Sequence, residues 1–141
     1  MYNSTYPGLS SVVIDTSALL AVLLEEPERP ALIAATTGAV LFAPSSLPWE
    51  VGNALVGATR RHRLALAEAQ RAWVGYEAIP LRLVDVDIGR AIATATDLGM
   101  YAYDAYFLEL ARYRGLPLLT LDKKLAAAAK ASGLGLVEFQ S

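Results

Sequence analysis

The sequence has 141 residues, which suits one domain, and 55% of them are hydrophobic, enough for a sizeable buried core. It contains no cysteine and a single histidine, His62, so disulfides, thiol catalysis, cysteine-ligated metals and a multi-histidine metal centre are excluded. The net charge of −2 does not by itself indicate a nucleic-acid-binding protein. Any metal would have to be bound mostly by oxygen atoms, as Mg²⁺ and Mn²⁺ are.

Residues 1–10 are polar and include Pro7 and Gly8, so we expect a flexible N-terminal extension ahead of one domain at residues 11–141. The extension lacks the basic start and apolar centre of a signal peptide. No apolar run approaches the ~18 residues that would span a bilayer. These patterns favour a cytoplasmic protein that does not associate with membranes.

Short apolar segments alternate with segments of helical periodicity along the rest of the chain. The predicted strands are residues 12–14, 39–44, 81–87, 116–122 and 134–139. The predicted helices are residues 18–24, 31–38, 47–63, 65–79, 88–99, 102–115 and 123–133. Because parallel neighbouring strands need helical crossovers, this alternation predicts an α/β domain with a five-stranded, mainly parallel sheet flanked by helices on both faces.

Local signals mark several of the helix boundaries. Pro27 and Pro30 are predicted to separate the first two helices. Asp87 is predicted to cap the helix that follows it, and Gly99 and Gly115 are expected at the C-terminal ends of their helices. Each of these residues serves backbone groups that a helix leaves unpaired at its ends.

Asp15 follows the first apolar strand and precedes two hydroxyl residues, Thr16 and Ser17. An aspartate at this point often caps a helix. Ser17, however, is better placed to cap a helix that begins at Ala18, and this would leave the Asp15 carboxylate available for another task. Ligands of open parallel sheets bind beyond the C-terminal ends of the strands, so Asp15 is a candidate site residue.

Three more acids are expected at the same edge of the sheet. Asp122 ends a predicted strand, whereas Asp104 and Glu50 lie in the first turns of helices that start from that edge. Each also has a plain structural explanation: helix capping for Asp122, the helix dipole for Asp104 and surface exposure for Glu50. Four neighbouring carboxylates repel one another unless a cation or shared protons offset the charge. A divalent metal bound by oxygen atoms is the simplest offset.

Polar neighbours could orient these acids. Ser17 and Thr120 are expected to donate hydrogen bonds to the carboxylates and so fix their directions. Asn53 lies three residues after Glu50 on the same helix face, where it either does the same or is an ordinary polar helix residue.

Positive charge gathers in two places. Arg60, Arg61 and Arg63 surround His62, and Lys123, Lys124 and Lys130 lie in the last predicted helix. A solvated helix end explains either group, and weak contact with nucleic-acid phosphates is the alternative.

Large apolar side chains are candidates for either the core or an interface with a partner. These residues are Trp49, Leu55, Val56, Trp73 and Tyr76.

Three segments carry a resemblance to a known family. They read VVIDTSALL, PSSLPWEVGNAL and YDAYFLELARYRGLPLLTLDKKL in chain order. Their order and spacing resemble those of the PIN-domain ribonucleases, and within that family those of the VapC-type toxins of bacterial and archaeal toxin–antitoxin pairs. The resemblance covers about residues 11–139.

This resemblance implies a Mg²⁺- or Mn²⁺-dependent endoribonuclease with a catalytic quartet of acids. By position the quartet is Asp15, Glu50, Asp104 and Asp122, with the metal held between Asp15, Asp104 and Asp122. The resemblance also implies cleavage that leaves a 5′-phosphate, a homodimer, and a small VapB-like antitoxin whose C-terminal segment covers the acidic groove.

Other functions stay open at this point. A housekeeping PIN nuclease of RNA processing would carry the same four acids. A phosphatase with an aspartyl nucleophile usually has a second aspartate two positions after the first, where this chain has Ser17. A non-enzymatic PIN-like scaffold that binds RNA or protein typically lacks some of the acids.

Overall fold

The computed structural model describes residues 11–140, so the expected N-terminal extension lies outside the described residues. Its centre is a four-stranded parallel sheet with the strand order β3-β2-β1-β4. The strands are β1 (Ser11–Ile14), β2 (Val40–Pro44), β3 (Leu81–Val84) and β4 (Leu118–Leu119). Because all four strands are parallel, their C-terminal ends lie at one edge of the sheet, and the order changes direction between β1 and β4.

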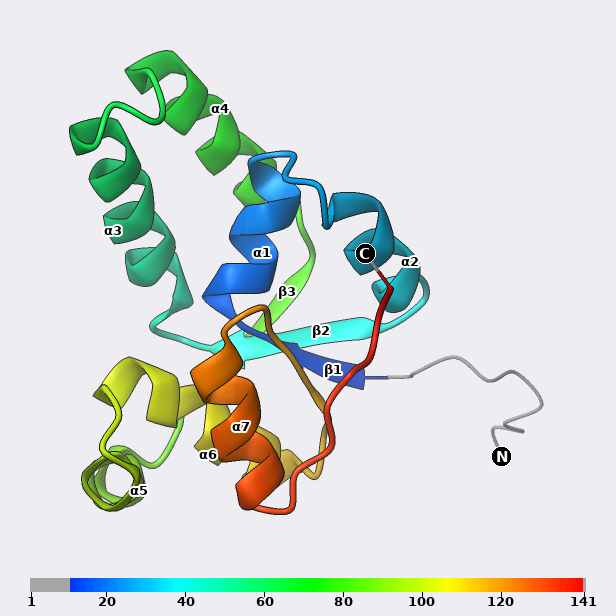
Figure 1. Cartoon of the computed structure of the whole chain (residues 1–141), viewed down its shortest axis with the longest axis vertical. Coiled ribbons are helices and arrows are strands. Elements are labelled where there is room, and N and C mark those ends of the chain that lie inside the picture. The colour runs from blue at the N-terminus through cyan, green and yellow to red at the C-terminus, as the bar shows by residue number, and fades with distance from the viewer. Residues whose placement is uncertain (1–10, 141) are drawn as a thin grey trace.

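Helices cover both faces of this sheet, as the sequence predicts. The helices of the described residues are α1 (Thr16–Leu23), α2 (Arg29–Thr36), α3 (Leu47–Arg60), α4 (Leu66–Glu77), α5 (Ile88–Leu98), α6 (Ala102–Arg114) and α7 (Lys123–Ala131). Figure 1 shows α1 to α4 on one side of the strands and α5 to α7 on the other. Within residues 11–140, no helix has the length and apolar character that crossing a membrane requires.

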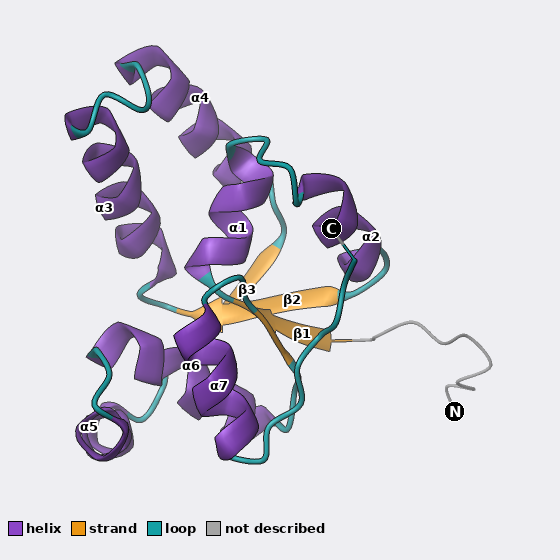
Figure 2. Cartoon of the chain, in the orientation of Figure 1, coloured by secondary structure: helices purple, strands orange, loops and turns teal. Residues whose placement is uncertain are grey.

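The predicted fifth strand, residues 134–139, is wrong. Leu136 makes only an isolated bridge to Leu118, flanked by backbone hydrogen bonds of 2.9 Å, and Figure 2 draws this part of the chain as a loop. Its neighbour β4 has only two residues, because the chain beyond Leu119 turns toward β1. The amide of Leu121 donates there to the Ser17 hydroxyl rather than to a neighbouring strand. A strand edge of two residues is too short to order a further strand.

Most of the boundary signals are confirmed, and one is wrong. Asp87 accepts a hydrogen bond of 3.0 Å from the amide of Arg90 and so caps α5. Gly99 and Gly115 end α5 and α6 in the left-handed conformation, with φ of 63° and 64°, which glycine adopts without strain. Pro30 does not separate two helices; it lies in the first turn of α2, where a missing N–H costs nothing.

The core lies between the sheet and the two helix layers. Val12 and Val13 of the central strand β1 are fully buried, as is Leu118 of the edge strand β4. Helix α6 packs directly on β1, β2 and β4 through residues that include the buried Phe107 and Leu108. The N-terminal turn of α6 therefore has a fixed position relative to the C-terminal edge of the sheet.

Candidate active site

Asp15 is the most buried of the four predicted acids, with 4% of its surface exposed. It is the N-cap of α1: its Oδ1 accepts a hydrogen bond of 3.0 Å from the amide of Ala18, and the helix begins at Thr16. The expectation that Ser17 caps this helix is therefore wrong. Asp15 serves as a cap and still directs its second carboxylate oxygen toward the end of β4.

Two hydroxyl groups orient the Asp15 carboxylate. Ser17 Oγ lies 2.8 and 2.9 Å from its two oxygens, and Thr120 Oγ1 donates to Oδ2 over 2.5 Å. Both hydroxyls also accept a hydrogen bond from a backbone amide just beyond β4. Ser17 accepts from Leu121 at 3.0 Å, and Thr120 accepts from Asp122 at 2.9 Å. The two strand ends are thus joined by a polar network in which Asp15 is the only charged side chain.

Glu50 lies in the first turn of α3 and is partly buried. Thr16 donates to its Oε1 over 3.1 Å, and Ser46 donates to its Oε2 over 2.8 Å. The sequence reading missed both donors, although the four-residue spacing of Ser46 and Glu50 is one that brings side chains together. Ser46 stands at the N-cap position of α3 without making a cap hydrogen bond, because its hydroxyl is used by Glu50.

Asp104 and Asp122 complete the group at the edge of the sheet. Asp104 lies in the first turn of α6 and is partly buried. Asp122 caps α7 through Oδ1, which accepts from the amides of Lys124 and Leu125 at 2.9 and 3.1 Å. The described hydrogen bonds of the Asp122 side chain use this one oxygen.

The four acids form a closed ring of electrostatic neighbours. The charge of Asp122 raises the pKa of both Asp15 and Asp104, and the charges of Asp104 and Asp15 raise the pKa of Glu50. Burial is the larger cause of the raised pKa at Asp15, Glu50 and Asp104. At Asp15 burial prevails over the hydrogen bonds from Thr120, Ala18 and Ser17, which lower the pKa.

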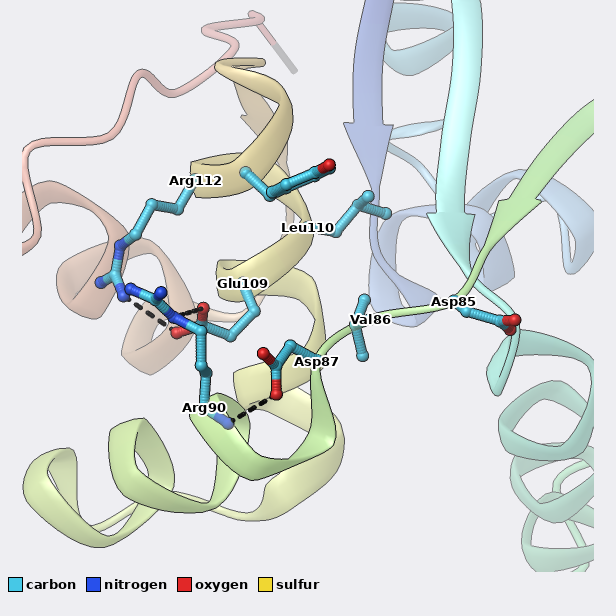
Figure 3. A pocket seen from close by; sticks show the side chains of 8 residues that line it. Asp85, Val86, Asp87, Arg90, Glu109, Leu110 and Arg112 are labelled. Carbon is cyan, nitrogen blue, oxygen red and sulfur yellow. Dashed lines mark hydrogen bonds and ion pairs between the residues drawn. The ribbon is translucent and has the colours of Figure 1, made fainter.

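No basic side chain balances this charge within residues 11–140. The ion pairs found there both involve Glu109, a buried acid of α6. Arg112 binds Glu109 over 2.9 Å, Arg90 lies 3.9 Å away, and Thr94 donates over 2.6 Å. Figure 3 shows Glu109 with Arg90 and Arg112 at a cavity of about 380 Å³, whose lining includes none of the four acids. The charge of the buried Glu109 is thus neutralised by arginine, whereas the four acids at the sheet edge have no ion pair among the described residues.

The donor set suits a hydrated Mg²⁺ or Mn²⁺ ion. All four groups are carboxylates, the ligands that such ions prefer. Among the described residues, no group of three or more acidic or imidazole side chains lies close enough to enclose an ion by itself. Mg²⁺ usually keeps several waters and binds through one or two carboxylates, so it does not require three protein ligands.

The weaker candidates differ in their relation to the acids. Asn53 is exposed and lines a pocket together with Glu50, and none of its described contacts is a hydrogen bond to a carboxylate. Arg60, Arg61 and Arg63 are exposed at the far end of α3, about 15 Å along the helix from Glu50 at 1.5 Å per residue.

Lys123 follows Asp122 directly and is exposed, so of the basic candidates it is the one beside the acids.

The large apolar candidates divide between core and surface. Leu55 and Tyr76 are buried, and Trp73 stacks on Tyr76 with ring centroids 4.9 Å apart. Trp49 and Val56 of α3 are exposed. Of these apolar residues, only Trp49 and Val56 therefore remain candidates for an interface with a partner.

The sequence also matches a known family of domains directly. The chain belongs to the PIN domain family, which it matches over residues 12–131. It is 32% identical over 120 residues to Ribonuclease VapC3 of Pyrobaculum aerophilum, a match that covers 82% of this chain and 92% of the relative. The resemblance to VapC-type ribonucleases is confirmed by this relative.

Solved structures share the fold. PAE2754 from Pyrobaculum aerophilum superposes with a TM-score of 0.65 at 24% identity, covering 85% of this chain and 86% of that one. VapC20 of Mycobacterium tuberculosis, a sarcin–ricin loop cleaving toxin, gives 0.60 at 16% identity over 83% and 94%. VapBC2 from Rickettsia felis, solved with a promoter DNA fragment, gives 0.62 at 12% identity over 92% and 99%.

Proposed function

We propose that this protein is a divalent-metal-dependent endoribonuclease that acts as the toxin of a toxin–antitoxin pair. The observation that carries the proposal is the ring of four coupled carboxylates, Asp15, Glu50, Asp104 and Asp122, which has no basic partner among the described residues. Such a charge is costly to keep in a fold unless it binds a cation. The similarity to Ribonuclease VapC3 indicates that the reaction in which this cation acts is RNA cleavage.

Asp15, Asp104 and Asp122 are the residues that would hold Mg²⁺ or Mn²⁺, directly or through water. A bound divalent ion supplies charge neutralisation at the phosphate and a water molecule of lowered pKa. The Thr120 and Ser17 hydroxyls keep Asp15 in one orientation, so the carboxylate presents the same oxygens in every catalytic cycle.

Glu50 or Asp122 would orient the attacking water and accept its proton. Burial and two neighbouring acids raise the pKa of Glu50, which makes its carboxylate a better base than an exposed glutamate. The water oxygen forms a new bond to phosphorus, and the bond from phosphorus to the 3′ oxygen breaks. Its electron pair stays on that oxygen, which takes up a proton from solvent. The products are a 5′-phosphate and a 3′-hydroxyl, and His62 takes no part.

The protein partners that we expect follow from the harm that uncontrolled RNA cleavage does to the cell. A nuclease that arrests growth must be restrained, so a small VapB-like antitoxin is the expected partner, together with a second copy of this chain in a homodimer. An arginine of the antitoxin can pair bidentately with a carboxylate and so replace the charge of the metal. A cytoplasmic location goes with the proposal, since the RNA substrate is there.

The nuclease proposal is tested by metal-dependent cleavage of a structured RNA by the purified protein. Cleavage should need Mg²⁺ or Mn²⁺ and stop with EDTA, and Asp104→Asn should reduce it at least ~1,000-fold. Asp97→Asn is the matched control, because Asp97 is an exposed aspartate on α5. RNA that stays intact with wild-type protein in both metals would favour the non-enzymatic scaffold.

The metal itself can be followed without RNA. At about 100 times its dissociation constant, Mg²⁺ should stabilise the wild type by about 2.7 kcal/mol. For a domain of this size that is a rise in melting temperature of roughly 5–10 °C. Asp104→Asn should show a smaller rise and Asp97→Asn the full one.

The toxin role is tested by growth. Induction of the chain alone in its native host or a close relative should stop growth, and Asp104→Asn should not. A small protein encoded beside it should restore growth and co-purify. Active enzyme with neither growth arrest nor a small partner would favour the housekeeping nuclease instead.

A further inference from the structure

We propose that Trp49 and Tyr103 form a stacking subsite that holds one unpaired nucleobase of the RNA substrate beside Glu50. The inference rests on the proposed RNA cleavage and adds to it a specific contact with the substrate.

Both aromatic residues stand directly before an acid of the quartet. Trp49 precedes Glu50 in the first turn of α3, and Tyr103 precedes Asp104 in the first turn of α6. The two turns border a pocket of about 220 Å³. Its lining consists of Thr16, Trp49, Glu50, Asn53, Ala54 and Tyr103.

These rings are presented to solvent rather than used in the core. Trp49 is 76% exposed, whereas the other tryptophan of the chain, Trp73, packs on Tyr76. Tyr103 is 53% exposed and is held edge-on by Tyr106, with ring centroids 5.7 Å apart and planes at 85°. A tryptophan is usually largely buried, so an indole left open beside an acidic site calls for an occupant.

The chemistry of the pocket favours a nucleobase. Proteins bind single-stranded RNA largely by stacking its bases on aromatic rings. A neutral base can approach Glu50 without the repulsion that the acids impose on a phosphate. Asn53, which also lines the pocket, offers an amide donor and acceptor to the edge of a base. The pocket is also smaller than the ~300–1,000 Å³ that drug-sized ligands need, which suits a single ring system.

The first experiment measures cleavage of an eight-nucleotide single-stranded RNA in Mg²⁺. Trp49→Ala and Tyr103→Ala should each raise KM about 5- to 150-fold, the range for loss of one base–aromatic stack, with kcat largely kept. Trp49→Phe should restore most of the affinity, because a phenyl ring still stacks. Tyr113→Ala should behave as wild type. It is the matched control because Tyr113 lies in the last turn of α6 and is 86% exposed.

The second experiment identifies the base. Each nucleotide of the RNA is replaced in turn by an abasic one. One position should weaken cleavage by the wild type and have little further effect on Trp49→Ala, because the contact is already lost. In Trp73→Phe, where Trp49 is the remaining tryptophan, stopped-flow mixing with the intact RNA should quench the fluorescence before cleavage, and the RNA lacking that base should not.

The outcomes separate the two proposals. If the wild type cleaves RNA but Trp49→Ala and Tyr103→Ala behave like Tyr113→Ala, the stacking subsite is overturned and the nuclease stands. If these variants keep their KM but no longer co-purify with the small protein partner, the aromatic pair belongs to a protein interface and the subsite is likewise overturned. If the wild type cleaves no RNA, it is the proposed function that fails.

Discussion

Thr120 donates a hydrogen bond of 2.5 Å to Oδ2 of Asp15, although 105 positions separate the two residues in the sequence. The contact forms because β1 and β4 are parallel neighbours, so that the residues that follow them meet at one edge. The same hydroxyl accepts the amide of Asp122 at 2.9 Å. Thr120 therefore orients the Asp15 carboxylate and ties it to the backbone at Asp122.

Thr120→Val should lower Mg²⁺-dependent cleavage and Mg²⁺ affinity about 10- to 100-fold, as loss of a group that orients a ligand commonly does. Valine keeps the shape of threonine but cannot donate to Asp15, and this donor is one that lowers the pKa of the carboxylate. The control is Thr96→Val, since Thr96 is exposed on α5 and its hydroxyl donates to the carbonyl of Ile92 in the same helix. Normal Mg²⁺ affinity in Thr120→Val would show that the hydroxyl does not orient the site.

Asp15→Asn and Asp15→Ala should separate the two roles of this residue. Asparagine caps helices about as well as aspartate, so Asp15→Asn should lose cleavage by at least ~1,000-fold yet melt in EDTA at or above the wild-type temperature. Asp15→Ala should lose both cleavage and the cap, a cost of about 0.5–2 kcal/mol. Paired melting and cleavage measurements decide the matter: an Asp15→Asn protein that melts well below the wild type in EDTA would make the carboxylate structural.

The metal-free protein should become less stable as the pH rises from about 4 toward neutrality, as far as this group of acids contributes. Asp15, Glu50 and Asp104 all have a raised pKa in the fold, above ordinary values of 3.8, 4.5 and 3.8. The folded state then binds more protons than the unfolded chain above those values, so its stability is lost as the pH rises through the folded pKa. Urea titrations in EDTA across this range measure the slope.

The slope should become shallower in Asp15→Asn and stay unchanged in Asp97→Asn. Saturating Mg²⁺ should also reduce it, because the cation favours the charged carboxylates. An identical slope in the wild type and Asp15→Asn would contradict the raised pKa of Asp15.

His62→Asn should keep the turnover number of the wild type. His62 is exposed and follows α3 in the left-handed conformation, with φ of 58°, which asparagine also tolerates. Any effect should be weaker RNA binding that fades as salt is added. Normal RNA binding with turnover lost by several orders of magnitude would overturn a mechanism carried by the four carboxylates.

Much of the fold followed from local patterns in the sequence. The alternation of apolar strands and amphipathic helices was enough to predict a parallel α/β domain with helices on both faces. Asp87, Gly99 and Gly115 marked helix ends correctly, because caps depend on the conformation of one residue and its nearest neighbours. The family could also be named from short motifs.

Tertiary contacts decided the rest. Residues 134–139 have the apolar character of a strand, but β4 stops after Leu119, because the next amides bond to the Ser17 and Thr120 hydroxyls. Asn53 shares a helix with Glu50 yet lines a pocket with Tyr103 from another helix. No sequence spacing gives the position of one helix against another, since that depends on packing across the sheet.

Asp15 shows most directly where the division lies. The sequence predicted Asp15 at the end of a strand. From the sequence, helix capping and a role in the candidate site were alternatives for this residue. In the structure one carboxylate oxygen of Asp15 caps α1. The other accepts a hydrogen bond from Thr120, which follows the neighbouring strand β4. A carboxylate has two oxygens that can accept bonds from different directions, and only the parallel pairing of β1 with β4 brings the second partner to it.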